Sequence, residues 1–398
     1  MKSETKPRIL CLSAYNAVSH QRWYQAISAG LPRYQWHDLS LPPRHFRWRI
    51  RGNPLSWLEE PLLQQPWDLL IATSMVDLAT LRGLHPSLAG VPALYYCHEN
   101  QFFYPSQNAR QRNHEPAMVN LYGALAADRV LFNSAFNRDS FIRGACELMA
   151  RLPDCTPDTL ERRLRERSQV LPVPLEEAAF VPPAGEDSGP GRWGPQGQGA
   201  DTGPLRLVWA ARWEYDKGPE RLLATLQALE AQGTDYRLCV LGESFRQRPE
   251  AFDRIERDFA HRLVQFGHEP DRDQYYRWLR SAQIVLSTSL HEFQGLAVLE
   301  AIACGCVPVL PDRLVYPEQV GEAYRYPSDQ SDLAAEATGA AALIARQGAL
   351  CQSGQARVPD VSGYAWPRLA RAYRECIDDA IARGRGGWSP GRDGVIPA

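Results

Sequence analysis

The sequence predicts an α/β protein with two domains, each built around a parallel β-sheet. Short apolar segments of strand length alternate with longer amphipathic segments in both halves of the chain, which is the repeat of such sheets. The 398 residues suffice for two cores of ordinary size. A stretch rich in Gly and Pro separates the halves and contains little that could pack. We therefore predict an N-terminal domain over 1–181, a flexible linker over 182–204, a C-terminal domain over 205–382 and a disordered tail over 383–398.

Composition excludes several classes of protein. The net charge of −2 gives no global attraction to nucleic acid, so any contact with a polyanion would be local. Nine scattered cysteines, an odd number, disfavour a disulfide framework and favour free thiols. No apolar run approaches the roughly 18 residues of a membrane span, and the apolar run near the N-terminus is too short for a signal peptide. We expect a soluble, cytoplasmic protein without membrane contact.

The first predicted strand, 8–13, leads into a turn that lacks glycine. A nucleotide-binding unit of this kind would carry a glycine-rich turn here. Polar side chains occupy it instead, which indicates that a ligand is held by side chains and not by close approach of the backbone. We assign Ser13, Asn16, Ser19 and His20 to an acceptor site, and Ser19 also suits the cap of the helix that carries Trp23.

Arginine and aromatic residues alternate between 44 and 51. This composition suits phosphate contacts beside platforms on which bases can stack. The alternative is a cationic surface strand with Phe46 and Trp48 buried on its other face. Because the chain as a whole is slightly acidic, the local density of arginine favours a polyanionic partner. The candidate acceptor contacts are Arg44, Arg47, Arg49 and Arg51.

Further strands are predicted at 67–73, 92–96 and 128–133, and polar residues directly follow the second of these. Ligands of parallel sheets bind at the carboxyl ends of the strands. A single histidine there is more often structural, but a run of four polar residues followed by aromatic residues favours a site. We predict that His98, Glu99 and Asn100 contribute to it.

The C-terminal domain begins with a predicted strand at 205–210, followed by Arg212 and then by Lys217 before an amphipathic helix. Two cations beside a helix N-terminus outline a site for a diphosphate. Strands at 236–241 and 262–266 end next to Gly242 and Gly267, and the second of these turns would face a nucleobase.

The most informative stretch is 287–311. Glu292 lies in the loop after a strand at 284–286, and Gly295 closes that loop before a helix, 296–304, that is apolar nearly all round. Glu300 must be buried on this helix, and a buried carboxylate needs partners, which a ligand rich in hydroxyls would provide. The backbone N–H groups that start the helix favour a phosphate; they belong to Gly295, Leu296 and Ala297.

This stretch resembles the pattern E-x-F-G followed by E-A-x-x-x-G-x-P of family 4 retaining glycosyltransferases. Gln294 departs from the pattern, because it stands between Phe293 and Gly295. The resemblance covers 206–318 and implies the GT-B fold, in which two Rossmann-like domains with parallel sheets face a central cleft. It implies that Glu292 contacts the donor sugar and Glu300 the nucleotide ribose.

The same resemblance implies a mechanism without a metal or cofactor. Arg212 and Lys217 would stabilise the departing diphosphate, Glu292 would orient the sugar, and His98 would share charge stabilisation near it. These four residues are therefore the candidate catalytic residues.

Three N-terminal segments, 10–23, 41–57 and 95–105, resemble the tRNA-queuosine mannosyltransferases. That resemblance implies GDP-mannose as the donor and tRNA carrying queuosine as the acceptor. Two alternatives stay open. A lipid or polysaccharide acceptor would predict exposed amphipathic helices in the N-terminal domain, and none stands out. A non-catalytic RNA-binding protein on a transferase fold would predict loss of the diphosphate cations or the two glutamates, and all four are present.

Overall fold

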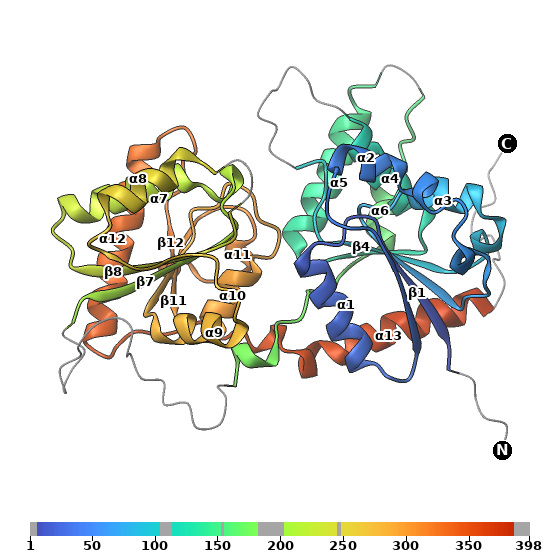
Figure 1. Cartoon of the computed structure of the whole chain (residues 1–398). Coiled ribbons are helices and arrows are strands. Elements are labelled where there is room, and N and C mark those ends of the chain that lie inside the picture. Colours follow the sequence, from blue (N-terminus) through green and yellow to red (C-terminus); the bar gives the residue numbers. More distant parts are fainter. Residues whose placement is uncertain (1–5, 104–113, 153–154, 182–202, 245–247, 386–398) are drawn as a thin grey trace. The chain divides into compact units, whose positions relative to one another are not determined.

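Two compact units make up the structure. The computed structural model describes residues 6–103, 114–152, 155–181, 203–244 and 248–385. Unit 1 comprises Met1–Pro174 and Trp366–Ala398, and unit 2 comprises Leu175–Ala365 (Figure 1). The chain therefore enters unit 2 after Pro174 and returns to unit 1 after Ala365.

The units divide the chain differently from the predicted domains. Residues 175–181 belong to unit 2, and the last helix belongs to unit 1, although the prediction assigns residues up to 382 to the C-terminal domain. That helix continues to Arg385, so the predicted tail begins too early. Nearly all of the predicted linker, and the tail from residue 386, lie outside the described residues.

Unit 1 is built on a parallel sheet of six strands in the order β2-β1-β3-β4-β5-β6. Strands β3 and β4 are buried along their whole length, as expected where helices cover both faces of a parallel sheet. The strands are β1 (Arg8–Ser13), β2 (Gln35–Ser40), β3 (Leu69–Thr73), β4 (Ala93–Cys97), β5 (Arg129–Phe132) and β6 (Ser168–Val170).

The helices among the described residues of unit 1 pack on the two faces of this sheet (Figure 1). On one face, Trp23 of α1 donates from its indole to the hydroxyl of Tyr373 of α13 at 3.0 Å. The other face carries α2 to α6, whose apolar side chains join one core with the strands. The helices are α1 (Val18–Gly30), α2 (Phe46–Ser56), α3 (Leu78–Leu84), α4 (Glu115–Ala126), α5 (Ala135–Met149), α6 (Leu160–Arg167) and α13 (Trp366–Arg385).

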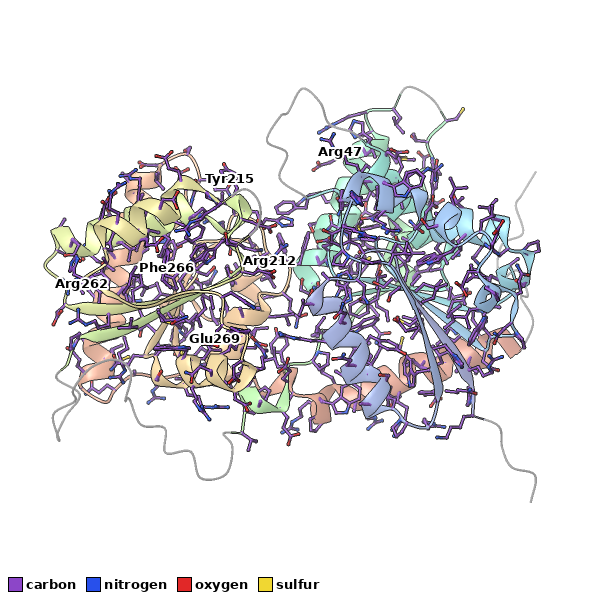
Figure 2. All side chains as sticks on the ribbon, in the orientation of Figure 1. Arg47, Arg212, Tyr215, Arg262, Phe266 and Glu269 are labelled. Carbon is purple, nitrogen blue, oxygen red and sulfur yellow. The ribbon has the colours of Figure 1, made fainter. Side chains whose placement is uncertain are left out.

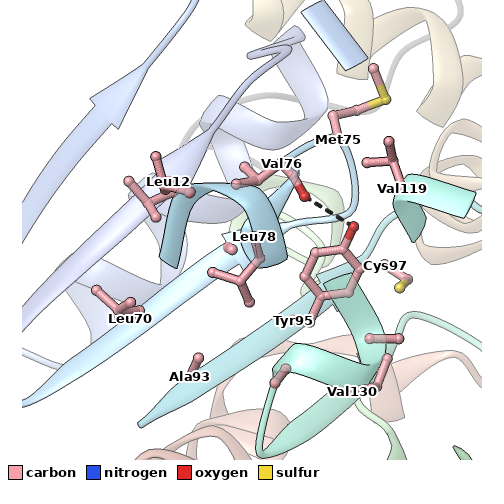
Figure 3. Close-up of a cluster of buried hydrophobic side chains, with 14 of the residues drawn as sticks. Leu12, Leu70, Met75, Val76, Leu78, Ala93, Tyr95, Cys97, Val119 and Val130 are labelled. Carbon is pink, nitrogen blue, oxygen red and sulfur yellow. Dashed lines mark hydrogen bonds between the residues drawn. The ribbon is translucent and has the colours of Figure 1, made fainter. Parts of the chain in front are cut away.

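The core beneath α2 to α6 takes alternate residues from β1, β3, β4 and β5. Leu12, Leu70 and Val130 contribute from three strands, and Tyr95 contributes from β4 (Figure 3). The buried hydroxyl of Tyr95 donates to the carbonyl oxygen of Val76 at 3.3 Å and to that of Ser74 at 2.7 Å. Burial of the apolar area stabilises this packing, and the hydrogen bonds satisfy the one polar atom of the Tyr95 side chain.

Unit 2 contains a second parallel sheet of six strands, in the order β12-β11-β10-β7-β8-β9. The chain builds outward from β7 to β9 and then returns to the other side of β7 with β10. Ligands of such sheets bind at the carboxyl ends of the strands where the order reverses. The strands are β7 (Leu205–Ala210), β8 (Tyr236–Leu241), β9 (Leu263–Gly267), β10 (Ile284–Leu286), β11 (Val307–Pro311) and β12 (Arg325–Tyr326).

Helices also cover both faces of the second sheet (Figure 1). Helices α7, α8 and α12 share a core with one face, and α9 and α10 lie on the other. The helices are α7 (Pro219–Ala231), α8 (Glu250–Asp258), α9 (Arg272–Ser281), α10 (Leu296–Ala303), α11 (Tyr316–Gln319) and α12 (Leu333–Gln352).

The arginine-rich segment is helical, so the alternative of a surface strand is wrong. It forms α2, which begins after His45, a residue in the left-handed region with φ of 55°. Ile50 faces the core, Phe46 packs at its edge, and Trp48 is 53% exposed. The two aromatic residues therefore do not share a buried face.

Within the part of the chain that the structure describes, no helix is both long enough and apolar enough to cross a membrane.

Candidate active site

Two predicted donor residues meet where the order of the second sheet reverses. Lys217 ends the short 3-10 helix η5 (Tyr215–Lys217) after β7, and Glu292 lies in the loop after β10. The ammonium of Lys217 lies 3.2 Å from Oε2 of Glu292 and donates to the carbonyl oxygen of His291 at 2.8 Å. The two side chains are adjacent because β7 and β10 are neighbours in the sheet.

We call Asp216, Lys217, His291 and Glu292 the lysine cluster. Asp216 adds a second carboxylate 3.1 Å from the Lys217 ammonium. Burial alone would lower the pKa of Lys217, but the charges of Glu292 and Asp216 outweigh it and raise that pKa. Burial would raise the pKa of Glu292, but the Lys217 charge outweighs it and lowers that pKa. Lys217 and Glu292 therefore form an ion pair, and the Asp216 carboxylate lies beside the same ammonium.

His291 is neutral in this environment. Burial, and then the charge of Lys217, lower its pKa to about 4. It adds polar atoms to the lysine cluster without adding a second positive charge.

Glycine is required where the two loops of this site approach each other. Gly218 has φ of 68°, and a Cβ atom on it would lie 2.1 Å from the carbonyl oxygen of Thr288. The hydroxyl of Thr288 donates to the carbonyl oxygen of Lys217 at 2.9 Å. These contacts hold the backbone of Lys217 and Gly218 against the loop that carries Glu292.

The start of α10 also holds Glu292. The N–H of Phe293 donates to Oε1 of Glu292 at 3.1 Å, and the N–H of Gly295 also donates to this carboxylate. Gly295 has φ of 69°, which glycine adopts without strain. Leu296 and Ala297 are the first two residues of α10 and are half-buried, so their N–H groups stay candidates for a phosphate.

Arg212 lies at the carboxyl end of β7 and is half exposed. In Figure 2 it lies toward the end of the second sheet at which the strands finish, while Arg262, which precedes β9, lies toward the opposite end. The guanidinium of Arg212 is 2.8 Å from the carboxylate of Glu214. A diphosphate bound here would therefore compete with Glu214 for this cation.

Glu300 is buried as predicted, but the protein supplies its partners. It is 7% exposed; Oε1 accepts from Arg272 and from the Tyr276 hydroxyl, and Oε2 accepts from the Tyr275 hydroxyl at 2.9 Å. The expectation that this carboxylate has partners is confirmed, and side chains of the protein provide them. The ribose contact itself stays a prediction.

The two predicted donor glycines lie together at the ends of β8 and β9. The N–H of Gly242 donates to the carbonyl oxygen of Gly267 at 3.1 Å. A Cβ atom on Gly242 would lie 1.9 Å from the carbonyl oxygen of Ala211, so this glycine is explained by packing. Gly267 has φ of 129°, and apart from its chain neighbours no described residue has a heavy atom within 4 Å of the position of a Cβ on it.

In unit 1, His20 and His98 form a stacked pair. Their ring centroids are 4.0 Å apart with 18° between the planes, and Trp23 packs edge-on against His98. Burial lowers the pKa of His20 to about 4 and, with a smaller contribution from His20, lowers that of His98 well below its usual value. Two neutral imidazoles from α1 and from the end of β4 therefore lie in contact.

Asn100 has a structural role, which corrects its assignment to the acceptor site. It is fully buried, and its amide donates to the side-chain oxygen of Asn137 at 2.8 Å and to the hydroxyl of Ser140 at 3.0 Å. Its own side-chain oxygen accepts from the N–H groups of Phe102 and Phe103 at 3.1 and 3.0 Å. Both polar atoms are therefore used within the protein.

The other predicted acceptor residues of this region differ in exposure. Ser13 is buried at the end of β1, while Asn16 and Glu99 are half-buried, and Glu99 accepts from Gln101 at 3.4 Å. Ser19 is exposed but does not cap α1, because the helix begins one residue before it and Ala17 holds the cap position. Contact of these residues with an acceptor stays a prediction.

The four arginines near α2 are not equivalent. Arg44 and Arg47 are exposed, and Figure 2 shows Arg47 at the periphery of unit 1. Arg49 is half-buried. Arg51 binds the buried carboxylate of Asp77 and lies 3.7 Å from Glu115, so its charge is already neutralised. Arg44 and Arg47 are the better candidates for contacts to an external polyanion.

Sequence reasoning missed several members of these sites. Asp216 and His291 are each adjacent to a predicted residue, and that adjacency was the available signal. Arg272, Tyr275 and Tyr276 recur at i, i+3 and i+4 on α9, the spacing that places side chains on one helix face. Among the described residues, no group of three or more His, Cys, Asp or Glu side chains could hold a metal ion.

Each half of the chain matches a known protein family. Residues 8–175 match the family described as tRNA-queuosine alpha-mannosyltransferase N-terminal, and residues 195–346 match glycosyl transferases group 1. The tRNA-queuosine alpha-mannosyltransferase of Drosophila melanogaster is 35% identical over 79% of this chain and 81% of its own length. A GDP-mannose:cellobiosyl-diphosphopolyprenol alpha-mannosyltransferase of Xanthomonas oryzae is 28% identical over 46% of this chain and 50% of its own.

Solved structures agree on the fold. Sucrose-phosphate synthase from Thermosynechococcus elongatus matches with a TM-score of 0.62 at 14% identity, covering 94% of this chain and 100% of that one. The N-terminal domain of Candida albicans trehalose-6-phosphate phosphatase matches with a TM-score of 0.65 at 13% identity, covering 96% and 98%. With two parallel six-stranded sheets, the chain has the GT-B glycosyltransferase fold. It is a glycosyltransferase and belongs to the tRNA-queuosine alpha-mannosyltransferase family.

Proposed function

We propose that this glycosyltransferase moves mannose from GDP-mannose to the queuosine of a tRNA anticodon, with retention of configuration. The observation that carries the proposal is the 35% identity with the Drosophila enzyme, which extends over 79% of the chain. The geometry of unit 2 supports it, because the lysine cluster lies where the order of a parallel sheet reverses.

The lysine cluster suits a nucleotide-sugar donor. Lys217 is the buried cation for the diphosphate, Arg212 is the exposed one, and Glu292 is fixed by Lys217 and by backbone N–H groups so that it can bind sugar hydroxyls. Mannose is proposed as the sugar and GDP as the carrier because the Xanthomonas relative is named for GDP-mannose.

The reaction breaks the bond between the anomeric carbon and the diphosphate oxygen and forms one from that carbon to the acceptor oxygen. Negative charge develops on the leaving GDP, where Lys217 and Arg212 stabilise it. The acceptor hydroxyl attacks from the face that the diphosphate leaves, and its proton passes to a phosphate oxygen. The catalytic role of His98 stays a prediction; because its pKa is lowered well below the usual value, it would act as a hydrogen-bonding group and not as a cation.

The acceptor is proposed to bind unit 1. The family description for residues 8–175 is that of the tRNA-queuosine enzymes, and α2 with the residues just before it presents Arg44, Arg47 and the exposed ring of Trp48. Exposed arginines beside an exposed aromatic ring suit phosphates and bases. A cytoplasmic location stays a prediction from the sequence.

We also propose that no metal is needed, because two protein cations are positioned to neutralise the diphosphate. Activity should be unchanged in excess EDTA. The measurement is the initial rate of mannose transfer before and after chelation. A loss that Mg²⁺ or Mn²⁺ restores would mean that a metal ion neutralises the diphosphate.

The choice of donor can be tested with one acceptor preparation. Queuosine-containing tRNA is incubated with labelled GDP-mannose, UDP-glucose or ADP-glucose, and label retained on the tRNA is counted. The proposal predicts transfer from GDP-mannose above the other two donors. Equal or preferred transfer from another nucleotide sugar would contradict the assigned donor.

A further inference from the structure

Glu300 holds an asymmetric set of hydrogen bonds. Oε1 accepts from both Arg272 and the Tyr276 hydroxyl, and Oε2 accepts from the Tyr275 hydroxyl alone among the described residues. A carboxylate oxygen accepts two hydrogen bonds readily. Oε2 is therefore the oxygen with capacity left for a ligand.

Arg272 is shared between two carboxylates. Its guanidinium binds Glu300 on one side and lies 3.0 Å from Oε2 of Glu176 on the other. The ring centroids of Tyr275 and Tyr276 each lie 4.4 Å from the guanidinium carbon, so both aromatic rings also contact this cation. This arrangement fixes one orientation of Arg272 and, through it, one rotamer of Glu300.

Glu176, the second carboxylate bound to Arg272, lies in the segment by which the chain enters unit 2. It follows Leu175, which pairs with Ala365 where the chain leaves unit 2, and the N–H of Leu175 donates to the carbonyl oxygen of Tyr364 at 2.9 Å. Oε2 of Glu176 also lies 3.2 Å from the Tyr276 hydroxyl, so this hydroxyl shares its one hydrogen between Glu176 and Oε1 of Glu300. Glu300 is thus tied, within unit 2, to the segment by which the chain enters that unit.

We propose that Arg272 and Tyr275 are positioning residues that aim Oε2 of Glu300 at a hydroxyl of the donor ribose. The inference rests on the proposed function, since it requires a nucleoside diphosphate in unit 2. Arg272 binds Oε1, which the Tyr276 hydroxyl can also reach, and Tyr275 orients Oε2 while leaving it a further acceptor position. Without Arg272 or Tyr275, the Glu300 side chain would sample several rotamers, and its contact with the ribose would weaken.

A purely structural role for these residues makes a different prediction. If they served only to neutralise a buried carboxylate, their loss would weaken the fold and affect every nucleotide alike. Positioning acts only on ligands that carry the ribose hydroxyls. The ratio of affinities for GDP and 2′,3′-dideoxy-GDP isolates this contact, because the two nucleotides share base and diphosphate.

The experiment measures the Kd of both nucleotides by calorimetry for the wild type, Arg272→Met and Tyr275→Phe. The wild type should bind GDP about 10-fold or more tightly than the dideoxy nucleotide, as expected for a hydrogen bond to a charged group. Both variants should bring this ratio close to one while the Kd of the dideoxy nucleotide changes little. Tyr275→Phe removes a single oxygen atom, so it tests the idea even if Arg272→Met fails to fold.

Arg277→Met is the matched control, because Arg277 is an exposed arginine of the same helix. It should keep the wild-type ratio. The inference is overturned if folded Tyr275→Phe keeps the wild-type preference for GDP, or if the wild type shows no preference. Failure of the wild type to bind either nucleotide would instead contradict the proposed function.

Discussion

At the scale of single residues, the proposed donor site depends on charged side chains that lie in contact with one another. Lys217 is 7% exposed and has two carboxylates within 3.2 Å. Removing one member of such a group leaves the others unpaired, which costs about 3–5 kcal/mol in comparable sites. Isosteric changes are therefore more informative than truncations.

Glu292→Gln should keep the fold and lose activity. The amide oxygen can still accept from Lys217 and from the backbone, but the charge that pairs with the ammonium is gone. We expect kcat/KM to fall by about 100-fold or more, as for other preorganised electrostatic groups. The measurement is mannose transfer beside the thermal midpoint, with Glu322→Gln, an exposed change in unit 2, as control. Full activity in a folded Glu292→Gln would remove this residue from the site.

The stacked histidines predict a pH dependence of stability. Burial lowers the pKa of His20 from 6.5 to about 4, so the unfolded chain binds more protons than the folded one between these values. Stability should therefore be full above about pH 6.5 and decline as the pH falls toward 4. His98 acts in the same direction.

Urea unfolding at pH 7.5 and 5.5 measures this effect. At pH 5.5, His20 should account for a loss on the order of 1 kcal/mol in the free energy of unfolding. His20→Phe preserves an aromatic ring and should flatten the decline by that amount. An unchanged pH dependence in His20→Phe would show that His20 does not titrate on unfolding.

Residue types and spacing predicted some of these contacts and not others. Lys217 and Glu292 each follow a predicted strand, and parallel strands bring such residues to one edge, so their meeting followed from the sequence. The partners of Asn100 could not be predicted, because Asn137 and Ser140 come from a helix whose packing the sequence does not specify. The sequence does not show whether the hydrogen-bond partner of a buried polar residue is a ligand or another residue of the protein.

At the scale of elements, α2 is a helix whose sequence pattern is typical of a strand. Arginines at 47, 49 and 51 alternate as in a strand, yet the segment is helical. On a helix, positions i and i+4 are neighbours, and the ring of Trp48 lies against Gly52, where a Cβ would be 2.5 Å from it. The arginines are therefore distributed around the helix, and only some face outward.

This distribution changes the prediction for tRNA binding. Arg44→Gln with Arg47→Gln should weaken tRNA binding and reduce its salt slope by about 0.7–0.9 for each phosphate that the variant no longer binds. GDP-mannose affinity should stay the same, because the lysine cluster belongs to unit 2. Binding is measured at several salt concentrations for the variant and the wild type.

Arg162→Gln with Arg163→Gln is the control for charge, since both arginines are exposed on α6 in the same unit. It should leave the slope near that of the wild type. If the α2 variant also keeps the wild-type slope, α2 does not contact phosphates.

At the scale of the whole molecule, the strands with continuous apolar runs were predictable, and the edge strands β2 and β12 were not. β2 lies at the edge of its sheet and is half exposed, and β12 has two residues, so neither shows the pattern of a buried strand. The last helix, α13, packs with unit 1 through Tyr373, a contact between residues 350 positions apart. Sequence patterns report local periodicity, so they indicate this helix but not the side chains on which it packs.

Transfer of mannose to queuosine in tRNA can be measured on the tRNA itself. One tRNA is prepared in two forms that differ only in having queuosine or guanosine at the modified position, and each is incubated with GDP-mannose and the enzyme. The tRNA is digested to nucleosides, which are analysed by mass spectrometry. We predict queuosine heavier by one hexose in the first sample and no hexose on any nucleoside in the second. Hexose on both forms, or on neither while a lipid-linked or polysaccharide acceptor is labelled, would contradict the proposed function.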